Sequence, residues 1–181
     1  MTSRGSVGGD ERLRLFLALR LPDEWIEGIV AWQAAAFADS RVRVVPREHL
    51  HVTLVFLGST PAGELPGILE RLRAAATASA PVRLRPDRYR ETRAVAMLTF
   101  EDVDGAGGAL ADALGRDEGR PWLAHVTVAR YRERPRLRQE FPEPLRTHVL
   151  VPSDAAAYLS KLRPSGAEYE VLASFGLGGT E

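Results

Sequence analysis

The sequence predicts an α+β fold made of two related lobes of antiparallel sheet, with helices on the outside and a cleft between the lobes. Strand and helix patterns alternate along the chain in two similar rounds. Each round contains one strong strand pattern that begins with His-Val-Thr and an aliphatic residue, at His51–Leu54 and at His125–Val128. The surroundings of the two copies differ, which indicates a weak internal repeat and not an array of identical units.

Apolar periodicity and turn residues define the first round of elements. Leu21, Trp25 and Ile29 recur at helical spacing, and Pro22 favours a helix start at this point. The strand pattern around the first His-Val-Thr is expected to end at Gly58. In chain order, we predict a strand at 12–19, a helix from Pro22 to about Ala38, a short strand at 42–45, a strand at 50–57 and a helix at 64–79.

The second round repeats the strand–helix alternation and ends in strands. Its helix is rich in alanine and is entered through glycines, and its proline- and arginine-rich stretch at 132–146 is typical of a long loop. In chain order, we predict strands at 82–85 and 94–100, a helix at 105–114, a strand at 123–129, extended segments at 148–151 and 155–162, and a last strand at 168–175.

Length and composition indicate one soluble globular domain. The chain has 181 residues and carries 24 basic and 24 acidic side chains. We expect a disordered tail at 1–11, followed by a single two-lobed domain at 12–178 that acts as a monomer. Zero net charge argues against coating of long nucleic acid, so any contact with nucleic acid should be local.

The absence of cysteine and of a long apolar run excludes several classes of site. The chain contains no cysteine, which excludes disulfides, thiolate metal sites and a cysteine nucleophile. No apolar run is long enough to span a bilayer, so we expect no membrane association. Together these features predict a cytoplasmic protein.

The two His-Val-Thr strands predict acid–base chemistry on a phosphate. Because side chains alternate along a strand, His51 and Thr53 share one face, as do His125 and Thr127. Two histidines with pKa values near neutrality can hold a base and an acid together, as the opening of a phosphodiester by water requires. The threonine hydroxyls can bind the non-bridging oxygens, and a strained cyclic phosphate needs no metal or other cofactor.

The chain resembles the LigT-like family of RNA 2',3'-cyclic phosphodiesterases, also called 2'-5' RNA ligases, within the 2H phosphoesterase superfamily. Two His-x-Thr motifs, one in each lobe, are the signature of that superfamily. The resemblance extends from about Arg12 to Gly178 and includes four stretches in the expected order. They are RLFLALRLPDE, REHLHVTLVFLG, GRPWLAHVTVAR and LSKLRPSGAEYEVLASFGLG.

The resemblance implies hydrolysis of a terminal RNA 2',3'-cyclic phosphate to a 2'-phosphomonoester, without a metal. It implies that His51 is the proton donor and His125 the proton acceptor that activates water. Thr53 and Thr127 match the phosphate-binding threonines. It also implies that RNA 3' ends, tRNA fragments among them, are the partners, and that tRNA halves can be joined through a 2'-5' linkage in vitro.

Two further positions match family residues that contact the substrate. The resemblance implies that Phe56 stacks on the base and that Arg130 contacts phosphate. Each lies five residues after its histidine, so a regular strand would point it away from the cleft, and the match requires a β-bulge or a strand end. Core packing of Phe56 and a solvent role for Arg130 remain open. Ala124 and Val128 depart from the family's usual proline and leucine.

Two other functions are compatible with the same motifs. The cleft could act on another small cyclic phosphate, such as an ADP-ribose cyclic phosphate. Alternatively, the protein could be a non-catalytic module that binds RNA ends. Comparing turnover of different substrates would distinguish the first alternative from an RNA phosphodiesterase. Tight binding of RNA ends without product would indicate the second.

The remaining candidate residues can be interpreted either as structural or as functional. His49 and His51 form a His-x-His pair that could hold zinc together with His125, although no carboxylate pattern supports a metal. His148 stands alone, and Lys161, the only lysine, lies in a stretch that resembles the family. Two arginine clusters could guide RNA or could be solvated faces paired with acids, and the glycines near 105–108 fit no nucleotide-binding motif. The clusters are Arg130, Arg132, Arg134, Arg136 and Arg138, and Arg83, Arg85, Arg88, Arg90 and Arg93.

Overall fold

The computed structural model describes residues 11–38, 41–117 and 119–178, and within them every strand belongs to one antiparallel sheet. The strand order is β4-β5-β6-β3-β1-β7-β8, and β2 pairs with the C-terminal end of β6. The predicted tail, apart from Glu11, lies outside the described residues. The strands are β1 (Arg12–Arg20), β2 (Arg43–Val44), β3 (His51–Pro61), β4 (Leu84–Glu91), β5 (Val95–Asp102), β6 (His125–Arg130), β7 (Asp154–Arg163) and β8 (Gly166–Gly176), and the helices are α1 (Asp23–Ala36), α2 (Leu65–Ala78) and α3 (Ala106–Ala113).

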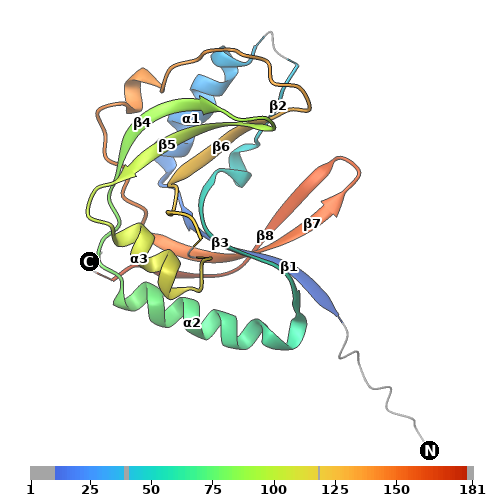
Figure 1. Cartoon of the computed structure of the whole chain (residues 1–181), viewed down its shortest axis with the longest axis vertical. Helices are drawn as coiled ribbons and strands as arrows, with labels where there is room; N and C mark the ends of the chain where they lie inside the picture. The colour runs from blue at the N-terminus through green and yellow to red at the C-terminus, as the bar shows by residue number, and fades with distance from the viewer. Residues whose placement is uncertain (1–10, 39–40, 118, 179–181) are drawn as a thin grey trace, which may run out of the picture.

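The sheet is curled into two lobes, which confirms the predicted α+β, two-lobed architecture (Figure 1). One lobe contains β4, β5, β6 and β2, and the other contains β3, β1, β7 and β8. The lobes meet where β3 and β6 pair through Val52 and Val126. Helix α1 covers the outer side of the first lobe, while α2 and α3 cover the outer side of the second, so none of the three described helices covers the inner face of either lobe.

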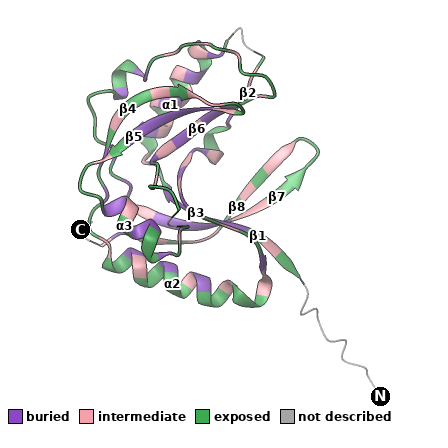
Figure 2. Cartoon of the chain, viewed as in Figure 1, coloured by how far each residue is buried: buried purple, intermediate pink, exposed green. Residues whose placement is uncertain are grey.

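Apolar side chains on the helix-facing side of each lobe form the core, and the central strands are the most buried part of the chain (Figure 2). Trp25 of α1 is buried and makes edge contacts with Phe100 and Phe141, with ring centroids 5.6 and 6.4 Å apart. Gln33, which the apolar pattern did not single out, is also buried on this helix. Its side-chain amide donates to the carbonyls of Val45 and Val128 at 3.1 and 2.8 Å. This glutamine therefore ties α1 to β6, which carries the second motif, and to the residue that follows β2.

Two predicted strand boundaries are wrong, and a third predicted segment pairs through one residue only. Strand β3 does not end at Gly58, because its pairing with β1 shifts register there and then continues to Pro61. Strand β4 begins at Leu84 and extends to Glu91, well beyond the predicted range 82–85. The segment 148–151, predicted to be extended, pairs only through Leu150, which forms an isolated bridge to Leu84. In all three cases cross-strand pairing decides the boundary, which local propensity does not report.

Among the described residues, no helix combines the length and apolar character needed to cross a membrane. The predicted single domain at 12–178 stays a prediction.

Candidate active site

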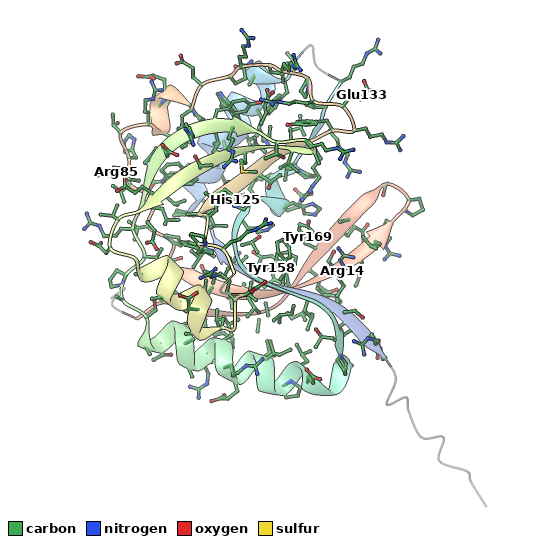
Figure 3. The ribbon with its side chains drawn as sticks, in the orientation of Figure 1. Arg14, Arg85, His125, Glu133, Tyr158 and Tyr169 are labelled. Atoms are coloured by element: carbon green, nitrogen blue, oxygen red, sulfur yellow. The ribbon has the colours of Figure 1, made fainter. Side chains whose placement is uncertain are left out.

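The two His-Val-Thr segments lie next to each other at the junction of the lobes. The antiparallel register pairs Val52 with Val126, which places His51 opposite Thr127 and Thr53 opposite His125. Both valines are fully buried, whereas the two histidines and two threonines are half-buried on the opposite face. Figure 3 shows His125 on one lobe, facing the lobe that carries Tyr158 and Tyr169. The structure thus brings the four predicted residues, here called the His/Thr quartet, onto one inner face.

Both imidazoles are held in the same orientation by a backbone carbonyl two residues earlier. His51 Nδ1 lies 2.7 Å from the His49 carbonyl oxygen, and His125 Nδ1 lies 2.9 Å from that of Leu123. Because a carbonyl oxygen only accepts, each Nδ1 carries the hydrogen, and Nε2 is left to exchange a proton. His51 Nε2 lies 3.0 Å from the Thr53 hydroxyl, which donates to it in the neutral state. The two histidines therefore each present the Nε2 atom for proton transfer.

His51 sits among aromatic rings. The ring centroid of Phe16 lies 4.9 Å from the imidazole, and those of Tyr169 and Tyr158 lie 5.7 and 5.8 Å from it. Burial in these surroundings lowers the pKa of His51 to about 4, partly opposed by its hydrogen bond to the His49 carbonyl, and the charges of His125 and Arg130 act in the same direction as burial. Without an anion in the site, His51 is therefore neutral at pH 7.

A β-bulge turns Phe56 toward the quartet. Two successive residues of β1 pair with Thr53 and Val55, so Leu54 has no partner of its own. The extra residue reverses the alternation, so that Leu54 and Val55 are both buried and Phe56 is 75% exposed. Its ring centroid lies 6.0 Å from that of Phe16, the residue that also contacts His51. Core packing of Phe56, one of the two sequence-based alternatives, is wrong.

The second motif contains an equivalent bulge. Successive residues of β5 pair with Thr127 and Ala129, which leaves Val128 as the extra residue of β6. Val128 and Ala129 are both fully buried, and Arg130 then emerges on the face of the quartet. Arg130 lines a cavity together with His51 and Thr127. In a regular strand, Phe56 and Arg130 would both point away from the inner face. In each case a one-residue β-bulge brings the side chain back to that face.

Two cavities flank the quartet, one on each side. The first, of about 110 Å³, lies between β2, the β7–β8 turn and the quartet, and His51 and Thr127 line it. The second, of about 610 Å³, is lined by Thr53 and His125 together with Phe56 and Trp122, among others. The site is therefore an inner surface with a cavity on each side of the quartet, and arginines line both cavities, Arg43 and Arg130 the smaller and Arg116 and Arg120 the larger.

Trp122, which the motif analysis missed, supports the backbone of the first motif. Its indole N–H donates to the Thr53 carbonyl at 3.0 Å. On the other side, the ring lies directly against Gly107 of α3, where an added Cβ would overlap it. A tryptophan three residues before a motif histidine was a weak sequence signal, because no pattern indicated which strand it would contact. Trp122 therefore couples α3 to the quartet.

We expect Gly107→Ala to lower the free energy of unfolding by about 1–3 kcal/mol, because the new methyl group overpacks the Trp122 contact. Gly108→Ala is a matched control, since the nearest atom to its added Cβ is Asp102 Oδ2 at 3.5 Å, an ordinary contact. Alanine is also the better helix former, by about 1 kcal/mol. Urea denaturation of both variants measures the difference, and equal stabilities would contradict the packing role of Trp122.

The other sequence candidates lie outside the quartet or have structural partners. His49 lines the smaller cavity, where its ring centroid is 4.5 Å from that of Tyr169. His148 is exposed and bonded to the Pro144 carbonyl, and Lys161 is paired with Glu170. Within the described ranges, no group of three or more histidine or acidic side chains is placed to hold a metal ion.

The glycines at the start of α3 do not form a free anion cradle. The carboxylate of Asp102 accepts from the backbone N–H groups of Gly107 and Gly108, at 3.3 and 2.8 Å. These two N–H groups in the first turn of α3 are thus already bonded to a side chain.

The two arginine clusters have different surroundings. In the second cluster, Arg83, Arg85 and Arg88 form ion pairs with Asp104, Glu101 and Asp87, as a solvated, balanced face would. In the first cluster, Arg130, Arg132 and Arg134 line a cavity beside the site together with Arg41 and Arg43. Arg43 was not a sequence candidate, since nothing in the sequence indicated that the short strand β2 would pair with the motif strand β6.

The curled antiparallel sheet with one His-x-Thr strand from each lobe defines a two-histidine phosphoesterase. A family model described as LigT like Phosphoesterase matches residues 19–90. The RNA 2',3'-cyclic phosphodiesterase of Thermus thermophilus is 30% identical over 189 residues, which cover 92% of this chain and 91% of that protein. The chain belongs to the LigT-like phosphoesterase family and is a hydrolase.

Solved structures show the same fold. The crystal structure of TT0787 from Thermus thermophilus superposes with a TM-score of 0.76 at 30% identity, covering 93% of this chain and all of that one. The crystal structure of LigT from E. coli complexed with phosphate superposes with a TM-score of 0.76 at 25% identity, covering 93% of this chain and 99% of that one.

Proposed function

We propose that this protein hydrolyses the 2',3'-cyclic phosphate at an RNA end to a 2'-phosphomonoester, with the His/Thr quartet as its catalytic centre. The observation that carries the proposal is the β3–β6 register, which sets each histidine opposite the threonine of the other motif. The relatives named RNA 2',3'-cyclic phosphodiesterase support the substrate class. A related structure, LigT from E. coli complexed with phosphate, supports a phosphate group as part of the ligand.

The proposed reaction begins with one histidine as base and ends with the other as acid. Nε2 of His125 takes a proton from water as its oxygen attacks phosphorus. The bond from phosphorus to O3' breaks, and O3' receives a proton from Nε2 of His51, which leaves a 2'-phosphate and a free 3' hydroxyl. Thr53 and Thr127 hold the non-bridging oxygens during attack, and Arg130 balances the charge.

The low pKa of His51 places a condition on this assignment. A proton donor must be protonated when the substrate is bound, yet burial keeps His51 neutral in the free protein at pH 7. The negative charge of a bound phosphate acts in the opposite direction and raises the pKa of a neighbouring imidazole. We therefore propose that substrate binding itself charges the acid.

The positions of Phe56 and Trp122 support a role for both in binding the nucleoside. Both line the larger cavity beside Thr53 and His125, and Phe56 presents an exposed ring there. We propose that the terminal base stacks on Phe56. The 2'-5' ligase reaction, the monomeric state and the cytoplasmic location stay predictions.

The test is turnover of a short RNA with a 2',3'-cyclic phosphate end in the presence of EDTA, with phosphorus NMR of the product. We expect a 2'-phosphomonoester, because the proposed acid protonates O3'. A 3'-phosphomonoester or complete dependence on added metal would contradict the mechanism. Tight binding without product would identify a binding module, and exclusive turnover of an ADP-ribose cyclic phosphate would assign a different substrate.

A further inference from the structure

Four arginines form a basic surface that begins at the quartet and leads away from it. Arg41, Arg43, Arg130 and Arg132 line a cavity of about 810 Å³, here called the arginine groove. Arg43 and Arg130 also line the smaller cavity that contains His51. Because the two cavities share these side chains, the arginine groove is continuous with the catalytic centre.

Among the described residues, neighbouring acids do not balance the charges of the arginine groove. Within residues 11–38, 41–117 and 119–178, no carboxylate forms an ion pair with Arg41, Arg43, Arg130 or Arg132. Glu133 is the single acidic residue among the described side chains that line the groove. The groove therefore carries an excess of positive charge, which an anionic ligand would neutralise.

The sheet register brings two of these charges together. Arg43 of β2 and Arg130 of β6 are direct partners across the strands. Like charges in directly opposite positions are destabilising, so this pairing favours an anion between or beside the two guanidinium groups. Arg43 also donates to the Ser165 carbonyl at 3.3 Å, in the β7–β8 turn. An added Cβ at Gly166 of this turn would lie 2.7 Å from Arg43 Nη1, so glycine provides the room for this guanidinium.

The outer wall of the groove is anchored to the first lobe. The carboxylate of Glu91, whose side chain is 3% exposed, accepts from the backbone N–H of Leu137 at 2.7 Å and from Arg134 Nε at 3.3 Å. The hydroxyl of Tyr131 donates to the Val95 carbonyl at 2.7 Å. The segment that carries Arg132 is thus held at both ends, which reduces the entropy lost when a ligand binds.

We propose that the arginine groove binds the phosphate on the 5' side of the terminal nucleotide, so that the enzyme prefers RNA oligonucleotides to cyclic mononucleotides. This inference rests on the proposed function, because the groove adjoins the quartet, where the proposed function places the cyclic phosphate. Arginine suits this role, since its planar group binds two phosphate oxygens at once. The neutral net charge of the chain is compatible with it, because the positive excess is local.

The kinetic test compares a 2',3'-cyclic mononucleotide with a tetranucleotide that ends in the same cyclic nucleotide. For the native protein we expect kcat/KM to be at least tenfold higher for the tetranucleotide. In the variant Arg41→Ala/Arg132→Ala this ratio should fall about tenfold. The ratio should remain at the native value in Arg71→Ala/Arg90→Ala, which removes the same charge from exposed positions outside the cavities described above. Equal kcat/KM values for both substrates in the native protein would overturn the inference while leaving the proposed function intact.

A binding measurement tests the arginine groove independently of the proposed hydrolysis. The probe is a fluorescent single-stranded RNA tetranucleotide with a 3'-phosphate, followed by anisotropy at several salt concentrations. We expect Arg41→Ala/Arg132→Ala to bind it about tenfold more weakly, with the salt dependence reduced by about 0.7 per lost phosphate contact. If this variant bound the probe with the affinity and salt dependence of the native protein, the proposed role of the arginine groove would be overturned, whether or not the protein hydrolyses a cyclic phosphate.

Discussion

Replacing either His51 or His125 with alanine is expected to lower kcat on a 2',3'-cyclic nucleotide by about 10²- to 10⁴-fold, the usual contribution of one acid or base. The two residues act in one proton relay, so the double variant should lose far less than the product of the two single losses. Both side chains are only half-buried, and their removal leaves the buried valines between the strands untouched. Each variant should therefore remain folded.

The matched control is His148→Ala, because this histidine is exposed and is bonded only to a local carbonyl. Its kcat should equal that of the native protein. Circular dichroism and binding of a nucleoside 2'-phosphate verify that the inactive variants keep their structure and pocket. A folded His51→Ala or His125→Ala protein with more than a tenth of native kcat would remove that residue from the catalytic pair.

The stability of the protein is expected to fall as the pH drops from about 6.5 to 4, and His51 should supply part of this loss. In the unfolded chain a histidine has a pKa near 6.5, whereas burial lowers the pKa of His51 to about 4 in the folded state. Between these values the unfolded state binds more protons, so stability rises with pH and is lost on acidification. At 1.36 kcal/mol per pKa unit, the contribution is up to about 3 kcal/mol.

Chemical denaturation at pH 7, 5.5 and 4 measures this effect in the native protein and in His51→Asn. Asparagine can still donate to the His49 carbonyl but does not titrate, so the difference between the two proteins isolates His51. His148→Asn should behave like the native protein. Inorganic phosphate should reduce the difference, because a bound anion favours the charged imidazole. An identical pH dependence in native protein and His51→Asn would show that the imidazole is not desolvated.

Strand alternation in the sequence was sufficient to place the four quartet residues on common faces. It could not place Phe56 and Arg130, because each depends on a bulge whose extra residue is defined only by the neighbouring strand. A bulge is defined by how two strands pair, and the sequence of one strand does not specify the register of that pairing. The aromatic surroundings of His51, with Phe16 as the nearest ring, likewise require the positions of three strands.

The arginine clusters illustrate the same limit. Both contain five arginines at close spacing, and the sequence favoured solvated faces for both. The structure pairs Arg85 with Glu101 across β4 and β5 but leaves Arg132 beside Arg41 and Arg43, which arrive from a distant part of the chain. Whether a charge is neutralised depends on which acids tertiary folding brings near it.

The sequence by itself determined most of the secondary-structure order, the two-lobed α+β class and the shared strand face of His and Thr in each motif, because these follow from local periodicity and from residue type. Only the tertiary structure decided that His51 is surrounded by aromatic rings, that two bulges return Phe56 and Arg130 to the inner face, and that an arginine groove adjoins the quartet. The physical reason is that burial, register and charge balance are relations between segments far apart in the chain.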